Sequence, residues 1–230
     1  MTQITRNPMD EPRYSGIPTF MRSPLATDFE GLDIALVGVP YDGAVEARSG
    51  ARQGPRQIRD MSSMMRAIHH VTRINPYQLC NVADAGDVTF KQIFDVVASH
   101  ADITEFYKRL HNFKITPLSA GGDHSITLPI MRAIAAKQPV GMVHIDAHTD
   151  CCDEEMNSKY SHGTPFRRAV EEGILDQKRS FQIGIRGAAN SDEFWTFGPN
   201  HGIRFVYIEE FNKLGVEKVI AEARRIVGEG

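Results

Sequence analysis

Short apolar runs alternate along the chain with stretches in which apolar residues recur at helical spacing. The runs that predict buried strands cover residues 33–39, 79–84, 115–120, 140–146, 181–186 and 203–208. The stretches that predict helices cover residues 56–67, 93–110, 128–136 and 216–227. Alternating strands and helices are typical of a parallel sheet covered on both faces. We therefore predict an α/β fold with three layers, α/β/α, and a mainly parallel sheet, in which sites form at the carboxyl ends of strands.

The composition narrows the class of protein. The chain has 230 residues, of which 41% are hydrophobic and 24% charged, with a net charge of −3, which suits one globular domain with a real core. No basic tract indicates a nucleic-acid or membrane partner, and no apolar segment is long enough to span a bilayer. The three cysteines, Cys80, Cys151 and Cys152, are odd in number and two are adjacent, which favours a reduced, cytoplasmic location.

The strongest chemical signal is the segment Asp146-Ala147-His148-Thr149-Asp150, directly after the apolar run that ends at Ile145. If this segment is extended, the side chains of Asp146, His148 and Asp150 point to one face at a strand's carboxyl end. Two carboxylates and an imidazole cannot share a buried place without a compensating positive charge, so the pattern predicts a metal ion. The alternative is a solvated strand end. His144, one step earlier on the same face, is interpreted as a packed or outer-shell histidine.

A second motif, Gly121-Gly122-Asp123-His124-Ser125, follows the neighbouring strand and opens the next helix. Its glycines allow a tight turn and a close approach of the backbone to a ligand. Asp123 or Ser125 could simply cap the helix, but a cap does not explain His124. We expect His124 to face the cluster that follows residue 145.

A third motif, residues 161–166 with the sequence SHGTPF, places His162 in a loop beyond the acidic residues 153–155. A loop histidine is usually solvated, and only the other two motifs make a functional role the better interpretation. The acidic residues either attract a cationic substrate or form a solvated turn, and the second interpretation is favoured. Cys151 and Cys152 suit small-residue packing better than thiolate ligation, because the other ligands are hard.

Together, the three motifs resemble the ureohydrolase (arginase/agmatinase) family, and most closely its agmatinase and guanidinobutyrase branch. The segment GARQGPRQIR at residues 50–59 matches that branch as well. The resemblance implies an N-terminal extension at residues 1–32 and an arginase-like ureohydrolase domain at 33–230. It also implies a hydrolase of carbon–nitrogen bonds in linear amidines. Such an enzyme cleaves agmatine, guanidinobutyrate or a similar small guanidine to urea and an amine.

The resemblance also implies two Mn²⁺ ions per subunit. His124 and Asp150 would bind one ion, His148 the other, and Asp146 would bridge them; Ni²⁺ accepts the same ligands. Such a metal pair can hold and activate a water molecule. Asp150 would accept a hydrogen bond from the nucleophile, and His162 would help to protonate the leaving amine or hold the substrate. Family members form homotrimers or homohexamers, and the same is expected here.

Two features depart from the family. The loop at residues 41–50 differs from its usual pattern, and here Glu46 and Arg48 are candidate substrate-binding residues. The family's last metal motif, with an Asp-x-Asp pair, is absent from residues 1–230, so we expect the polypeptide to continue past Gly230. Without that pair, two carboxylates face the four charges of two ions, and at least one ion should be weakly held. The alternative function is therefore a non-catalytic ureohydrolase-like subunit of a mixed oligomer.

Overall fold

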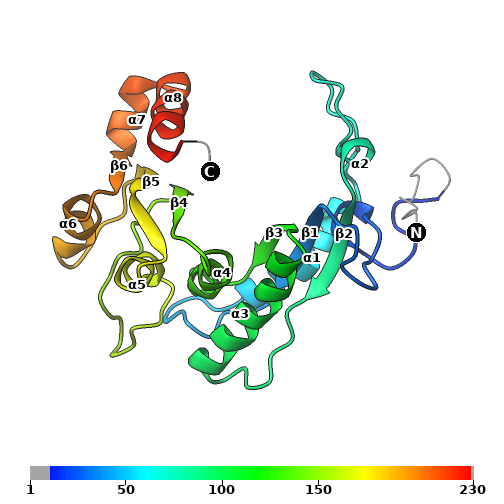
Figure 1. Ribbon diagram of the computed structural model, residues 1–230, viewed down its shortest axis with the longest axis horizontal. Helices are drawn as coiled ribbons and strands as arrows, with labels where there is room; N and C mark the ends of the chain where they lie inside the picture. The colour runs from blue at the N-terminus through cyan, green and yellow to red at the C-terminus, as the bar shows by residue number, and fades with distance from the viewer. Residues whose placement is uncertain (1–10, 229–230) are drawn as a thin grey trace. The chain divides into compact units, whose positions relative to one another are not determined.

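The computed structural model describes residues 11–228, so the expected N-terminal extension lies partly outside the described residues. The chain divides into two compact units, Met1–Asp123 and His124–Gly230, and each is described by itself (Figure 1). Among the described residues, no helix is both long and apolar enough to cross a membrane.

The first unit is built on a three-stranded parallel sheet with the order β2-β1-β3. Its strands are β1 (Ile34–Val39), β2 (Val82–Asp87) and β3 (Thr116–Gly121). Ile34 pairs in register with Val82 on one side and with Thr116 on the other. The central strand β1 is almost entirely buried, as expected for an apolar run covered on both faces.

Helices cover both faces of this sheet. On one face, α3 (Val96–Asn112) packs against β3, where the Tyr107 hydroxyl lies 2.5 Å from that of Ser119. Burial raises the pKa of Tyr107 to about 12, although the bond with Ser119 opposes the shift. On the other face, Phe20 of η1 (Phe20–Arg22) packs with Leu36 and Val82. Neighbouring residues of a strand point to opposite faces of the sheet, so the side chains of Leu36 and Val37 lie on opposite faces of β1.

Helix α1 (Gly54–Ser62) is fixed to β2 by a buried charge network, and η2 (Ala51–Gln53) leads into it. The Arg59 guanidinium donates to both carboxylate oxygens of Asp84, at 2.8 and 3.0 Å, and to Asp87 at 2.6 Å. Asp84 also accepts hydrogen bonds from the backbone N–H groups of Phe20 and Gly86, each at 2.9 Å. The guanidinium lies 4.1 Å from the centroid of the Phe20 ring. This network joins the N-terminal segment, α1 and β2.

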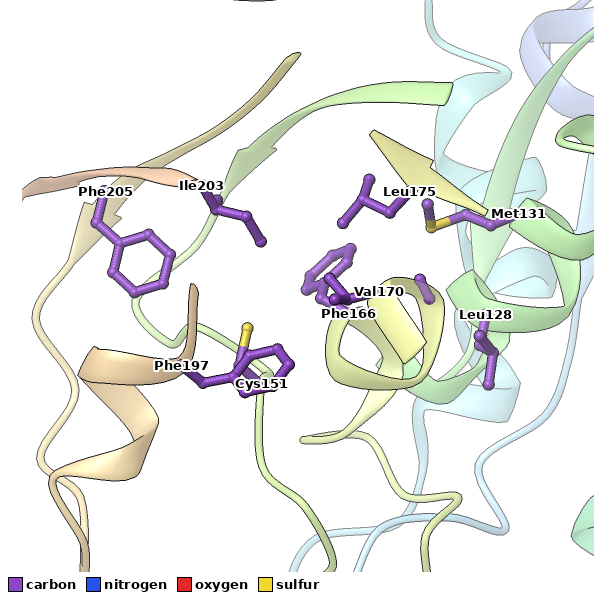
Figure 2. Packing of buried hydrophobic residues seen from close by; sticks show 10 residues of the cluster. Leu128, Met131, Cys151, Phe166, Val170, Leu175, Phe197, Ile203 and Phe205 are labelled. Atoms are coloured by element: carbon purple, nitrogen blue, oxygen red, sulfur yellow. The ribbon is translucent and has the colours of Figure 1, made fainter. Parts of the chain in front are cut away.

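The second unit has its own parallel sheet with the order β4-β5-β6. The strands are β4 (Val140–Ile145), β5 (Leu175–Ile185) and β6 (Arg204–Tyr207). Phe205 belongs to a core cluster with residues of α5 (Pro165–Glu171) and α6 (Glu193–Asn200), which Figure 2 shows. Its neighbour Val206 belongs to a different cluster with Val219 and Ala223 of α8 (Val216–Val227). Helices therefore cover both faces, giving three layers within this unit.

The remaining helices of the described residues are α2 (Pro76–Leu79), η3 (His124–Ile126), α4 (Thr127–Ile134) and α7 (Ile208–Leu214). Parallel sheets with flanking helices confirm the predicted α/β class. The helix predicted for residues 216–227 is found with those bounds. The strands predicted for residues 33–39, 115–120 and 140–146 are found within one residue at each end.

Some boundaries were wrong. The helix predicted for residues 56–67 ends at Ser62, because the later apolar residues Met64 and Met65 are exposed and find no core to pack against. The strand predicted for residues 79–84 begins at Val82, since Asn75 caps α2 and Leu79 is used by that helix. The helices α5, α6 and α7 were not predicted. They have seven or eight residues each, too few for a helical period to stand out.

Candidate metal centre

The candidate site begins where β4 ends, and there the backbone turns. Residues 146–148 form a bend, so the expectation that 146–150 is extended was wrong. The carboxylate Oδ1 of Asp146 accepts a hydrogen bond from the backbone N–H of His148 at 2.9 Å, a short Asx-type link that stabilises a turn. The N–H groups of Arg186 and Gly187 donate to the carbonyl of Ala147 at 2.9 and 2.8 Å. The turn is thus tied to the end of β5, and it places both carboxylates on one side.

Four side chains converge beside this turn. Nδ1 of His124 lies 2.5 Å from Oδ2 of Asp150 and 3.6 Å from Oδ2 of Asp146. Nε2 of His144 lies 3.4 Å from the same Asp146 oxygen. One ligand atom from each of the four residues lies within 4.8 Å of all the others. Two imidazoles and two carboxylates at this separation form a donor set that suits a divalent transition-metal ion.

The electrostatics of the cluster fit a cation. His144 is 7% exposed, and burial lowers the pKa of its imidazole, which favours the neutral form that can ligate. Burial opposes ionisation of Asp146, but hydrogen bonds and the nearby imidazoles, with the His148 N–H foremost, lower the pKa of its carboxyl. Neither ring nitrogen of His144 makes a hydrogen bond of acceptable geometry within residues 11–228. A buried polar group with no hydrogen bond is costly, and a bound cation would remove that cost.

Two histidines near Asp146 lie in different surroundings. His144 was interpreted as a packed or outer-shell histidine, and it is buried, packs on Phe166 and also belongs to the group of four. The signal that could have placed it there is its two-residue spacing from Asp146 on β4. His148 lies outside that group: its side chain is 64% exposed, and its Nδ1 lies 3.8 Å from Oδ1 of Asp146. The ligand roles of His124, Asp146, His148 and Asp150 stay predictions.

The loop that carries His162 is fastened to the segment that carries Asp150. The Cys152 N–H donates to the carbonyl of Gly163 at 2.9 Å, and the Phe166 N–H donates to the carbonyl of Asp150 at 3.1 Å. The Phe166 ring lies 4.5 Å from the ring of His144, centroid to centroid. The first four residues of the motif SHGTPF therefore lie in the loop, and its last two, from Pro165, begin α5. It packs an aromatic ring on the cluster and holds His162 in the adjoining loop.

A groove of about 390 Å³ lies beside the cluster, between α4 and β4. His124 and His144 stand in its wall, and the rest of its lining is mostly apolar. Within the described residues β4 is an edge strand, and its Val143 and Ile145 are 50% and 78% exposed. This lining is poorly matched to a guanidinium cation, so the groove is not assigned to substrate.

The sequence of the chain is similar to those of known proteins. A sequence model described as the Arginase family matches residues 32–230, which is most of the chain. The chain belongs to the arginase family. Guanidinopropionase of Pseudomonas aeruginosa is 52% identical over 220 residues, which are 95% of this chain and 69% of that enzyme. Guanidinobutyrase of the same organism is 44% identical over 95% of this chain and 70% of its own length.

A solved structure agrees with this assignment. Proclavaminate amidinohydrolase of Streptomyces clavuligerus superimposes with a TM-score of 0.88 at 36% identity, covering 95% of this chain and 73% of that one. The fold is thus arginase-like, as predicted. The ureohydrolase described here belongs to the branch of agmatinases and guanidino-acid hydrolases. It is an amidinohydrolase of guanidino compounds, a hydrolase of carbon–nitrogen bonds in linear amidines.

Two other candidate residues of this ureohydrolase, Glu46 and Arg48, lie in the unit Met1–Asp123 and are exposed. Their loop is organised by Asp42, a buried residue that the sequence did not single out. Asp42 accepts hydrogen bonds from the backbone N–H groups of Gly50 and Arg52, at 2.5 and 3.1 Å, and from the Arg52 side chain. Burial opposes ionisation, but these bonds lower the pKa of Asp42. The substrate-binding role of Glu46 and Arg48 stays a prediction.

The adjacent cysteines of the ureohydrolase are packing residues, as expected from the sequence. Both are buried, and Cys151 belongs to the core cluster around Phe166 (Figure 2). Burial is the main cause that raises the pKa of the Cys151 thiol, and it raises that of Cys152 to about 12. Both thiols are thus part of the packing, and the ligand atoms that converge within the described residues come from carboxylates and imidazoles.

Proposed function

We propose that this ureohydrolase is metal-dependent and releases urea from a small guanidino acid with the help of two Mn²⁺ ions per subunit, Ni²⁺ being the alternative ion. The observation that carries the proposal is the convergence of His124, His144, Asp146 and Asp150 within 4.8 Å. Two ionised carboxylates in that group balance the charge of one divalent ion before any further ligand is added.

Asp146 is the candidate bridge between the two ions, and its two oxygens support that role. Oδ2 faces the rings of His124 and His144, at 3.6 and 3.4 Å. Oδ1 faces the ring of His148 at 3.8 Å. The carboxylate therefore has the His124 and His144 rings near one oxygen and the His148 ring near the other, which suits one ion at each oxygen. The exposed ring of His148 has room to move toward a ligand position.

A metal pair in such a site supplies Lewis acidity and lowers the pKa of water toward neutrality. The residues of the chain supply the rest. Asp150, fixed beside His124, can accept a hydrogen bond from the attacking water and orient it toward the guanidino carbon. His162 can receive the proton released by that water and pass it to the departing amine nitrogen. Phe166 closes the apolar side of the cluster.

The proposed substrate is a guanidino acid such as 3-guanidinopropionate or 4-guanidinobutyrate, with agmatine as a competitor. The support is that the relatives at 52% and 44% identity are a guanidinopropionase and a guanidinobutyrase. Arg48 would pair with the carboxylate tail of such a substrate, whereas the negative charge of Glu46 would repel that carboxylate. We also propose a homotrimer or homohexamer in the cytoplasm, where the three free cysteines would stay reduced.

The test measures urea release by the natural protein across guanidinopropionate, guanidinobutyrate and agmatine, together with elemental analysis of bound metal. Asp146→Ala should remove bound metal and urea release, whereas Asp153→Ala, an acid seven residues later that bonds Arg168, should keep both. Two tightly held ions in Asp146→Ala would refute the bridging role. Wild-type protein that binds metal but releases no urea from any substrate would favour the non-catalytic subunit.

A further inference from the structure

Two of the three acidic residues after Asp150 pair with side chains of the loop and of α5, whereas Glu154 is exposed. Asp153 pairs with Arg168 at 2.7 Å. Glu155 accepts a short hydrogen bond from the Ser161 hydroxyl, and the same carboxylate oxygen, Oε2, lies 3.7 Å from Nδ1 of His162. Its other oxygen, Oε1, lies 3.8 Å from Sγ of Cys152. The side chain of Glu155 thus crosses the loop and lies close to Ser161 and Gly163, the two chain neighbours of His162.

The backbone fixes this arrangement. Glu155 and Ser158 exchange two backbone hydrogen bonds, at 3.0 and 2.8 Å, which close a tight hairpin. The absence of a side chain at Gly163 makes room for the Glu155 carboxylate, because a Cβ atom at residue 163 would lie only 2.6 Å from Oε1 of Glu155. The carboxylate is therefore held by a hairpin on one side and fits against a glycine on the other.

We propose that Glu155 is a positioning residue that holds the neutral His162 ring with its proton on Nδ1 and its lone pair on Nε2. The catalytic role of His162 in this inference rests on the proposed function, whereas the contact between Glu155 and His162 does not. A carboxylate oxygen 3.7 Å from Nδ1 lies beyond hydrogen-bond distance but still favours an N–H at that nitrogen electrostatically, and a neutral imidazole with its proton on Nδ1 carries its lone pair on Nε2. Nε2 then accepts a proton from the attacking water and gives it to the leaving amine, which returns the ring to the same tautomer.

The competing explanation is that Glu155 only closes the loop through Ser161. The two explanations differ in what the His162 ring senses. If Glu155 only closes the loop, replacing it leaves the ratio of the two His162 tautomers unchanged. If Glu155 positions the ring, replacing it lowers the share of the Nδ1–H tautomer, and that change is measurable without any turnover.

The experiment uses the natural protein labelled with ¹⁵N and loaded with a diamagnetic divalent ion, at a pH where the ring is neutral. Long-range ¹H–¹⁵N correlation reports the tautomer of each histidine, and the signals of His162 are those lost in His162→Gln. Wild type should show mainly Nδ1–H. Glu155→Gln keeps the shape but removes the charge, and it should lower the ratio of Nδ1–H to Nε2–H about threefold, as expected for loss of a partly exposed electrostatic contact.

Two further variants sharpen the result. Glu154→Gln makes the same change at the exposed neighbouring residue and should leave the ratio unchanged. Gly163→Ala displaces the Glu155 carboxylate without altering its charge and should reproduce the shift, so the inference remains testable if Glu155→Gln does not fold. An unchanged ratio in Glu155→Gln and Gly163→Ala would overturn the inference.

Kinetics of the natural protein provide the second measurement. Glu155→Gln should lower kcat about threefold with little change in KM, since the tautomer affects proton transfer and not binding. A tautomer shift without any change in kcat would overturn the catalytic part of the inference. Failure of the proposed function is distinguishable, because it would abolish urea release in wild type while leaving the NMR result intact.

Discussion

Replacing Arg59 with methionine should be among the most destabilising single changes outside the metal cluster. The Asp84 side chain is completely buried, and Arg59 supplies two of its four hydrogen bonds. Methionine fills most of the volume but leaves that carboxylate without a cation. Removing one partner of a buried ion pair costs about 3–5 kcal/mol. Loss of the guanidinium over the Phe20 ring adds about 0.5–2 kcal/mol.

The neighbouring pair provides an internal control. Asp87 bonds the same guanidinium, but its side chain is 43% exposed, so Asp87→Asn should cost only about 0–1 kcal/mol. Denaturant unfolding followed by far-ultraviolet circular dichroism gives both values. Hydrogen exchange at the Phe20 and Gly86 amides should accelerate in Arg59→Met, because both donate to Asp84. A cost below about 1 kcal/mol, with unchanged exchange, would refute the view that this network holds α1 and the N-terminal segment on β2.

Three other changes test the remaining interpretations. His162→Ala should leave bound metal unchanged and lower turnover about 10²–10⁴-fold, and unchanged turnover at saturating substrate would reduce His162 to a loop residue. Glu46→Gln should change the ranking of guanidino substrates by kcat/KM while largely sparing the best kcat, whereas an unchanged ranking would indicate a surface residue. The lowered pKa of Asp42 means that its stabilisation is complete above the unfolded value of about 3.9 and is lost as the pH falls through the lower folded value. The difference in unfolding free energy between wild type and Asp42→Asn should therefore shrink in acid, and a difference independent of pH would contradict this reasoning.

Much of the candidate site could be predicted from local sequence. The segment from Asp146 to Asp150 follows the carboxyl end of β4, and His124 belongs to the motif that follows β3, so residue type and position after a parallel strand together indicated a cation site. The turn after Ile145 was not predicted, because it depends on the Asp146 carboxylate bonding the backbone of His148 and on β5 bonding Ala147. These contacts are formed by neighbouring elements and have no sequence period.

The residues whose contacts the sequence did not predict share one property: their neighbours come from distant segments. His144 enters the cluster because His124 and Phe166 close around it. Glu155 turns inward because Ser161 bonds it and Gly163 leaves room. Asp84 needed Arg59 to become buried.

By itself, the sequence determined the strand and helix periods, the α/β class and the metal-binding character of the motifs, since side-chain type and spacing are local properties. The tertiary structure alone decided which imidazoles face the two carboxylates, which acids are paired and which helices end early. Those outcomes depend on the energy of burying each group against its particular neighbours, which spacing along the chain does not encode.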